Sequence, residues 1–293
     1  MYPCTMVVKL CKISTTGLIK KYRINSKTNA INSISVSIEK PGIYALVGPN
    51  GAGKTTLLKL LAGILHKTSG TLDIIGSAFY FPEISAYYSN LSALDHYNLI
   101  ANICEMKQII HSPKEILSIV GLPKDKLAKD FSKGMKRRLD VGMGLMIKTD
   151  ILLMDEPFDG LDPSIAEDLS NIIKEANNGH RIIIISSHDL TRVGDISDSI
   201  IFMKSGKIVS QVNNGNERNT IVIVENSDDN RKKLSNLNLI YRVKENNIHI
   251  EIKQRDLSGT VKIFDNLGIE IKDIKILNML DLYRDIIGGN FDN

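Results

Sequence analysis

The segment from residue 43 to residue 56 decides the fold, and it reads Ile-Tyr-Ala-Leu-Val-Gly-Pro-Asn-Gly-Ala-Gly-Lys-Thr-Thr. Its first five residues form an apolar run typical of a buried parallel strand. Its last residues begin a helical pattern that extends from Lys54 to Leu65. The loop between them matches the spacing G-x-x-x-x-G-K-[ST]. Its glycines let backbone N–H groups turn toward an anion, and the helix start adds the positive end of its dipole.

This loop is therefore predicted to bind the phosphates of a nucleotide. Lys54 is expected to reach the β- and γ-phosphates, and Thr55 to ligate Mg²⁺. The alternative is an ordinary glycine turn followed by a chance lysine, which the strand–loop–helix context disfavours. The candidate ATP-binding residues of the loop are Gly48, Pro49, Asn50, Gly51, Ala52, Gly53, Lys54, Thr55 and Thr56.

Composition places the chain among globular proteins. Its 293 residues predict about two domains, and 43% hydrophobic with 24% charged residues argues against disorder. The net charge of +4 is too balanced to make nucleic acid the expected main partner. Three cysteines without paired spacing suit a reducing compartment and predict no zinc site. The sequence has neither an apolar stretch of membrane-spanning length nor a signal peptide, so the expected location is cytoplasmic.

Further apolar runs at 151–154 and 182–185 alternate with helical patterns such as Pro163 to Asn177, which predicts an α/β fold with a parallel sheet. Residues 33–38 alternate with period two and predict a half-buried antiparallel strand. Residues 84–148 carry apolar side chains at helical spacing, and they are predicted to be a helical insertion.

The end of the chain is organised differently. A strand pair is predicted over 200–209, followed by a polar stretch from Asn213 to Asn219 that is the best linker candidate. Residues 1–212 are therefore predicted to form the main domain, and residues 213–293 a small α/β appendix with strands, a helix near 257–267 and a short final helix ending at Ile287.

Acidic and imidazole side chains follow the two later core strands. Asp155 and Glu156 end the run at 151–154, and His188 follows the run at 182–185. Open α/β sheets bind ligands at the carboxyl ends of their strands, so these groups are predicted to meet at the phosphates. Asp155 suits a Mg²⁺ contact, Glu156 a general base for water, and His188 a contact to the γ-phosphate. The structural alternatives are an exposed acidic turn and a structural histidine.

A fourth feature is a helix that begins at Ser132. Serine is a good N-cap, and the helix start that follows could bind an anion. Taken alone, this is an ordinary capped helix with a solvated basic face.

The four features occur in the order found in ABC-type ATPases, and the chain resembles that family over residues 7–210. Ser132, Lys133, Gly134 and Met135 resemble the signature motif in the variant of drug- and antibiotic-efflux ATPases. Asp162 resembles the acidic member of the D-loop, and Tyr22 resembles the aromatic residue that stacks on adenine, with a surface tyrosine as its alternative. The resemblance implies a P-loop NTPase fold with a parallel-sheet core, an antiparallel β subdomain and the helical insertion.

The resemblance also implies partners. In this family two ATPase subunits sandwich two ATP molecules, with the signature residues of one acting on the nucleotide of the other. Separate transmembrane subunits would dock near the helical insertion, at the cytoplasmic face of the membrane. Aromatic residues lie near the expected docking region, with core packing as their alternative; they are Phe79, Phe81, Tyr87 and Tyr88.

One departure from the family concerns the strand that enters the insertion, where glutamine is usual. Here Glu83 takes that position. Glu83 is expected to contact Mg²⁺ and to sense the docked membrane subunit, while the alternative is a solvated loop acid.

The resemblance indicates the ATP-hydrolysing subunit of an efflux or immunity transporter. The competing functions are a soluble ABC-type ATPase acting on ribosomes or DNA, and a regulatory subunit with little turnover. The single phosphate loop and the absence of heptads argue against the first, and the intact Lys54, Asp155, Glu156 and His188 argue against the second.

Overall fold

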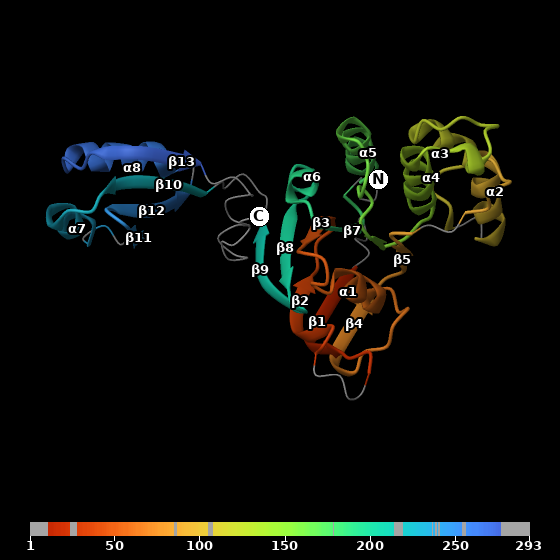
Figure 1. Ribbon diagram of the computed structural model, residues 1–293, viewed down its shortest axis with the longest axis horizontal. Helices are drawn as coiled ribbons and strands as arrows, with labels where there is room; N and C mark the ends of the chain where they lie inside the picture. Colours follow the sequence, from red (N-terminus) through yellow and green to blue (C-terminus); the bar gives the residue numbers. More distant parts are fainter. Residues whose placement is uncertain are drawn as a thin grey trace, which may run out of the picture. The chain divides into compact units, whose positions relative to one another are not determined.

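The computed structural model describes residues 11–23, 28–84, 87–104, 108–177, 179–213, 219–235, 237, 239, 241–253 and 256–276 (Figure 1). The chain divides into two compact units, Met1–Asn213 and Asn214–Asn293. Each unit has an apolar cluster of its own, so each is described by itself.

The first unit is built on a six-stranded sheet with the strand order β5-β6-β7-β3-β8-β9. Its strands are β3 (Gly42–Val47), β5 (Ala78–Phe81), β6 (Ile151–Met154), β7 (Ile182–Ser187), β8 (Ser199–Lys204) and β9 (Lys207–Asn213). All neighbours pair in parallel except β8 and β9, which form an antiparallel hairpin. Every residue of β3, β6 and β7 is buried, because helices and a second sheet cover both faces.

Helix α1 (Lys54–Leu61) follows β3 after the glycine-rich loop, as the sequence predicts. It ends four residues earlier than expected, because Gly63 adopts a left-handed conformation with φ of 71° and turns the chain. Helices α5 (Pro163–Ala176) and α6 (Leu190–Gly194) follow β6 and β7, respectively. The carboxyl ends of three neighbouring strands therefore each lead into a loop and a helix.

A smaller antiparallel sheet has the order β2-β1-β4 and consists of β1 (Lys12–Lys20), β2 (Ile31–Ile38) and β4 (Ser69–Ile75). The strand expected at 33–38 is part of β2. One apolar cluster joins this sheet, α1 and the central sheet, with Ile13, Ile34, Leu58 and Leu46 among its members. Helix α1 is thereby fixed between the two sheets.

The helical insertion lies between β5 and β6, as predicted. It contains α2 (Ala93–Ile103), α3 (Pro113–Ile119), the short 3₁₀ helix η2 (Ala128–Asp130) and α4 (Lys133–Met146). Helices α2 and α3 both begin with a capping box, formed by Ser92 with Asp95 and by Ser112 with Glu115. Of the aromatic residues expected near a docking surface, Phe81 is buried in the core and Tyr88 is exposed.

The second unit has a four-stranded antiparallel sheet with the order β11-β12-β10-β13. In chain order its elements are β10 (Asn219–Glu225), α7 (Asp228–Ser235), β11 (Tyr241–Lys244), β12 (Asn247–Lys253), α8 (Leu257–Asn266) and β13 (Ile271–Ile276). Apolar side chains from one side of the sheet pack with Leu234 of α7 and Phe264 of α8. The helix expected up to Ile287 lies outside the described residues.

Candidate active site

The loop between β3 and α1 has the backbone that its glycines predict. Gly53 is the N-cap of α1 with φ of 103°, and an added Cβ would lie 2.6 Å from the carbonyl oxygen of Ala30. Gly48 is equally restricted, because a Cβ there would overlap the carbonyl oxygen of Met203. Since no side chain caps α1, the first N–H groups of this helix are left for an anion.

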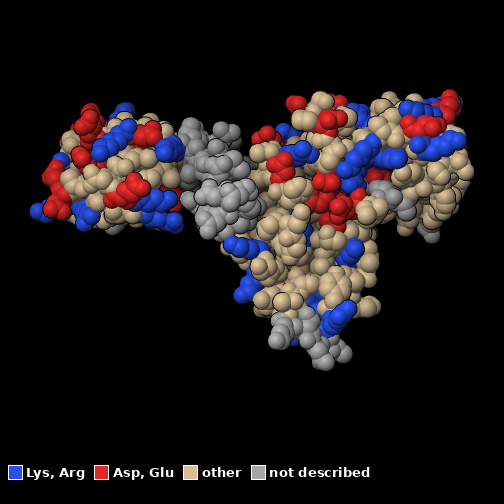
Figure 2. Space-filling model, in the orientation of Figure 1, with Lys and Arg blue, Asp and Glu red and all other residues tan. Residues whose placement is uncertain are grey.

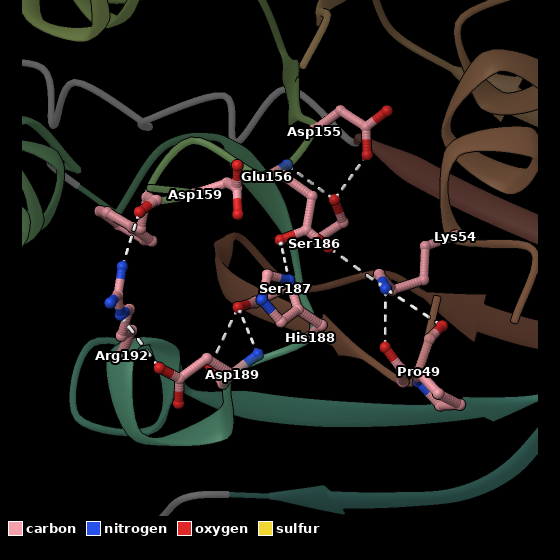
Figure 3. A network of polar contacts seen from close by, with 12 residues as sticks. Pro49, Lys54, Asp155, Glu156, Asp159, Ser186, Ser187, His188, Asp189 and Arg192 are labelled. Carbon is pink, nitrogen blue, oxygen red and sulfur yellow. Dashed lines mark hydrogen bonds and ion pairs between the residues drawn. The ribbon is translucent and has the colours of Figure 1, made fainter. Parts of the chain in front are cut away.

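Lys54 is buried, and its side chain bonds to carbonyl groups of the loop that precedes it. Its Nζ donates to the carbonyl oxygen of Gly48 at 2.6 Å and to that of Pro49 at 3.4 Å. The same Nζ lies 3.2 Å from Oε1 of Glu156, at the end of β6 (Figure 3). The positive charge of the loop is thus held beside the acid that the sequence predicts as general base.

Glu156 also contacts the residue after β7. Its Oε2 lies 3.0 Å from Nδ1 of His188, so that Nδ1–H donates to the carboxylate. The Glu156 side chain is only 11% exposed, whereas that of His188 is 44% exposed. The start of α1 and the ends of β6 and β7 therefore bring Lys54, Glu156 and His188 into one series of polar contacts.

Asp155 lies behind this group and is fully buried. Its Oδ1 accepts from the Ser186 hydroxyl at 2.6 Å, and its Oδ2 accepts from the Tyr80 hydroxyl at 3.0 Å. Burial raises the pKa of the Tyr80 hydroxyl, and the neighbouring Asp155 carboxylate raises it further. Tyr80 therefore keeps its proton and remains a donor to Asp155.

A cavity of about 510 Å³ opens in front of the loop. Its lining contains the loop residues from Asn50 to Thr56, together with Ala30, Glu83, Glu156, Asp159 and His188. In the view of Figure 2, acidic side chains gather below α5, beside a stripe of basic side chains between α4 and α5. Eight of the predicted residues, Asn50 to Thr56 and Glu83, therefore share one cavity with both predicted catalytic groups.

Other predicted residues lie apart from this lining. Asp155 lies behind the cavity, where it accepts from Ser186. The carbonyl oxygens of Gly48 and Pro49 accept hydrogen bonds from Lys54. The hydroxyl of Tyr22 lies 3.1 Å from Oγ1 of Thr56, next to the loop, and its side chain is largely exposed.

The signature-like residues begin α4. Ser132 is its N-cap and accepts from the backbone N–H of Met135, while Gly134 is packed against Ile165 of α5. The ammonium group of Lys133 lies 3.5 Å from Oδ2 of Asp159, and Asp162 is the N-cap of α5.

Two residues of the site, Tyr80 and Ser186, were missed by the sequence analysis, and both hold Asp155. Asp159, in the D-loop-like segment that ends at Asp162, lines the cavity, a role that the sequence did not predict for it. The signal for Ser186 was available, since β7 ends in two serines after four isoleucines. Polar residues at the buried end of such a strand indicate a hydrogen-bonded partner.

No group of three or more His, Cys, Asp or Glu side chains that could hold a metal ion occurs among the residues that the structure describes. A cation at this cavity would therefore depend on hydroxyl and phosphate oxygens in addition to carboxylates. Thr55, which lines the cavity, fits that role, and the acids of the same lining are Glu83, Glu156 and Asp159.

Comparison with known proteins identifies the family. The family model described as ABC transporter matches residues 31–159. A lantibiotic transport ATP-binding protein of Streptococcus pyogenes is 37% identical over 62% of this chain and 84% of its own length. A bacitracin transport ATP-binding protein of Enterococcus faecalis is 31% identical over 89% of this chain and 86% of its own length.

Solved structures share the fold. An ATP-binding cassette of an ABC transporter in its ADP conformation has a TM-score of 0.59 and 22% identity, covering 69% of this chain and 91% of that one. A cassette in a post-hydrolysis state with ADP and phosphate has a TM-score of 0.60 and 17% identity, covering 69% and 98%. With the phosphate loop, the two acids and the histidine in place, the chain belongs to the ABC transporter family of ATP-binding proteins.

Proposed function

We propose that the chain is the ATP-binding and ATP-hydrolysing subunit of a transporter that exports, or gives immunity to, an antibiotic or peptide. The observation that carries this proposal is the meeting of Lys54, Glu156 and His188 at the phosphate loop. The names of the relatives, which refer to lantibiotic and bacitracin transport, support the class of transported molecule.

The cavity suits ATP together with a cation. Its lining offers the N-terminal amides of α1 and the Lys54 ammonium to phosphate oxygens, but it also contains three carboxylates, those of Glu83, Glu156 and Asp159. Those carboxylates would repel a bare triphosphate. Bound Mg²⁺ would offset that repulsion by neutralising phosphate charge, with Thr55 as its protein ligand and Asp155 and Glu83 as its acidic neighbours.

Glu156 is placed to act as the general base. Its carboxylate lies at the cavity wall, where it can accept a proton from a water molecule that attacks the γ-phosphate. The Nδ1–H group of His188 donates a hydrogen bond to this carboxylate, so Nε2 faces no competition from Glu156 and can interact with water or phosphate. Tyr22, beside Thr56, is the candidate platform for the adenine ring.

A second ATPase subunit, identical or different, would complete the site. Among the residues that line the described cavity, none comes from the signature-like segment at Ser132 to Met135 or from Asp162. These residues instead occupy the starts of α4 and α5, where they could meet the nucleotide of a partner. The positive end of the α4 dipole suits such a contact with phosphate.

The pathway across the membrane would come from separate subunits. In the described parts of the chain, no helix has the length and apolar character needed for a membrane span. We therefore place the chain at the cytoplasmic face of the membrane, bound to transmembrane partners through the region of the helical insertion. The transport names of the relatives favour this function over action on ribosomes or DNA and over a low-turnover regulatory role.

The ATPase part of the proposal is tested with Lys54→Ala. This change removes the compact charge at the phosphates, so most ATP binding and turnover should be lost. Lys59→Ala is the matched control, because Lys59 is on the same helix but is not part of the cavity lining. Nucleotide affinity and phosphate release are measured for both variants, and wild-type values in Lys54→Ala would contradict the proposal.

The transport part is tested by purification of the tagged chain from detergent-solubilised membranes of its native host. Membrane subunits with several apolar spans should co-purify with it, and ATP turnover should respond to them. Recovery of ribosomal proteins or DNA in their place would favour the competing function.

A further inference from the structure

The hydroxyl of Ser186 lies between the two adjacent acids at the end of β6. It is 2.6 Å from Oδ1 of Asp155 and 2.9 Å from the backbone nitrogen of Glu156 (Figure 3). Ser186 itself is fully buried, and the residues that line the cavity do not include it. It can therefore act on the reaction only through its two neighbours.

The direction of both hydrogen bonds follows from their partners. A backbone N–H can only donate, so the Ser186 oxygen accepts from Glu156, and its own proton goes to the Asp155 carboxylate. The other oxygen of Asp155 accepts from Tyr80 at 3.0 Å. Tyr80 and Asp155 thus fix the Ser186 hydroxyl, which in turn fixes the backbone of Glu156.

The backbone of Glu156 needs such a fixed partner. It has a left-handed conformation with φ of 47°, which is uncommon for a residue other than glycine and persists only where the surroundings enforce it. The direction of the Glu156 side chain into the cavity depends on this conformation.

The side-chain contacts of Glu156 cannot hold its backbone in this conformation during turnover. Its carboxylate is paired with Lys54, and phosphate oxygens would compete for that same ammonium group. The contact with His188 involves a side chain that is 44% exposed. The hydrogen bond from the Glu156 amide to Ser186 is buried, and Ser186 is not among the residues that line the cavity.

From this geometry we infer that Ser186 is a positioning residue for ATP hydrolysis, which aims the Glu156 carboxylate by holding its backbone against Asp155. The inference rests on the proposed ATPase function. The Ser186 hydroxyl should matter for the rate of the chemical step and not for the binding of ATP, because its hydrogen-bond partners are Asp155 and Glu156 and it is not among the residues that line the cavity.

Steady-state kinetics of the full-length chain test this role with Ser186→Ala and Ser186→Thr. Loss of a buried hydrogen bond to a charged network should lower kcat about tenfold or more in Ser186→Ala, with KM within about twofold of the wild type. Ser186→Thr keeps both the donor and the acceptor, so it should recover most of the rate. Ser199→Ala is the matched control, because Ser199 is also a buried strand serine, and its hydroxyl donates to the carbonyl oxygen of Val212 at 3.2 Å.

Amide hydrogen exchange of the nucleotide-free chain gives a second readout that requires no turnover. The peptide containing Glu156 should lose protection in Ser186→Ala and keep it in Ser186→Thr and Ser199→Ala. If Ser186→Ala fails to fold, Ser186→Cys carries the same test, since a thiol fills the space but is a weak donor and acceptor. Failure of both to fold would overturn the inference, because the hydroxyl would then serve the fold alone.

The results separate this inference from the proposed function. A wild-type chain that binds ATP but shows no turnover, alone or with its partners, would contradict the proposed function. A wild-type chain that turns over ATP, combined with normal kcat and normal exchange in Ser186→Ala, would overturn the role of Ser186. A Ser186→Thr variant that folds but loses as much kcat as Ser186→Ala would overturn it as well.

Discussion

Glu156 shows how one residue serves two states of the site. Its carboxylate is paired with Lys54 at 3.2 Å, and both side chains are almost completely buried. A buried pair of this kind is stable only while both partners remain, because either charge alone would be costly there. Phosphate groups can take the place of the carboxylate beside Lys54, which would release Glu156 to act on water.

This exchange of partners leads to a prediction for Glu156→Gln. The amide cannot accept a proton from water, so turnover should fall by roughly 10²–10⁴-fold. Binding of ATP should be retained, or become tighter, because the nucleotide no longer has to displace a carboxylate from Lys54. Phosphate release and nucleotide titration measure the two effects.

The same chemical change at Glu167, on the exposed side of α5, is the matched control for Glu156→Gln and should leave both quantities unchanged. Wild-type turnover in Glu156→Gln would show that another group removes the proton.

At the scale of single elements, helix α2 is held at its start by a reciprocal pair. The Ser92 hydroxyl accepts from the Asp95 backbone N–H at 3.2 Å, and the Asp95 carboxylate accepts from the Ser92 backbone N–H at 3.1 Å. The hydrogen bond from the Ser92 hydroxyl, followed by that from its backbone N–H, lowers the pKa of Asp95. The helix start is therefore stabilised by the ionised form of this side chain.

The pH dependence follows from the sign of that shift. Because the pKa of Asp95 is lower in the folded chain than in the unfolded chain, its contribution is present above its ordinary pKa of about 3.9 and is lost as the pH falls through the folded value. Asp95→Asn should therefore lower the melting temperature at pH 7, and the difference from wild type should shrink in acid.

Thermal unfolding followed by circular dichroism measures this difference. Asp125→Asn, at an exposed position between η2 and α3, is the matched control. An equal difference between Asp95→Asn and wild type at neutral and acidic pH would mean that the carboxylate charge does not stabilise α2.

At the scale of the whole molecule, the two units bury separate apolar clusters. The first cluster joins the small sheet, α1 and the central sheet, and the second joins β10, β12, α7 and α8. All residues that line the described cavity belong to the first unit. The catalytic unit should therefore not depend on the second unit for its folding.

A chain that ends at Asn213 should consequently fold cooperatively and bind ATP with an affinity close to that of the full chain. Circular dichroism and nucleotide titration measure both properties. A chain that ends at Ser197 is the informative contrast, because it also lacks β8, whose pairing with β3 supports the phosphate loop. The chain that ends at Ser197 should fail to fold. Loss of ATP binding in the chain that ends at Asn213 would show that the second unit supports the site.

Local sequence determined the phosphate loop, the buried strands and the identity of the reacting groups. Glycine at positions 48 and 53 is dictated by backbone geometry, and four β-branched isoleucines in a row favour a strand buried on both faces. Helix starts at Lys54 and Pro163 were equally readable, because a glycine loop and a proline at the first helical turn mark them. The strands β1 and β4 were not located individually, since polar residues and Gly17 interrupt the apolar pattern of β1, and most residues of β4 are exposed.

Only the tertiary structure decided how these groups are held. Sequence placed Asp155 and Glu156 side by side, yet β6 ends so that one is fully buried behind the cavity and the other lines it. The hydroxyls of Tyr80 and Ser186 reach Asp155 from neighbouring strands, 75 and 31 residues away along the chain. Such contacts depend on the order β5-β6-β7 in the sheet, and strand order is a property of the packed chain that no local pattern contains.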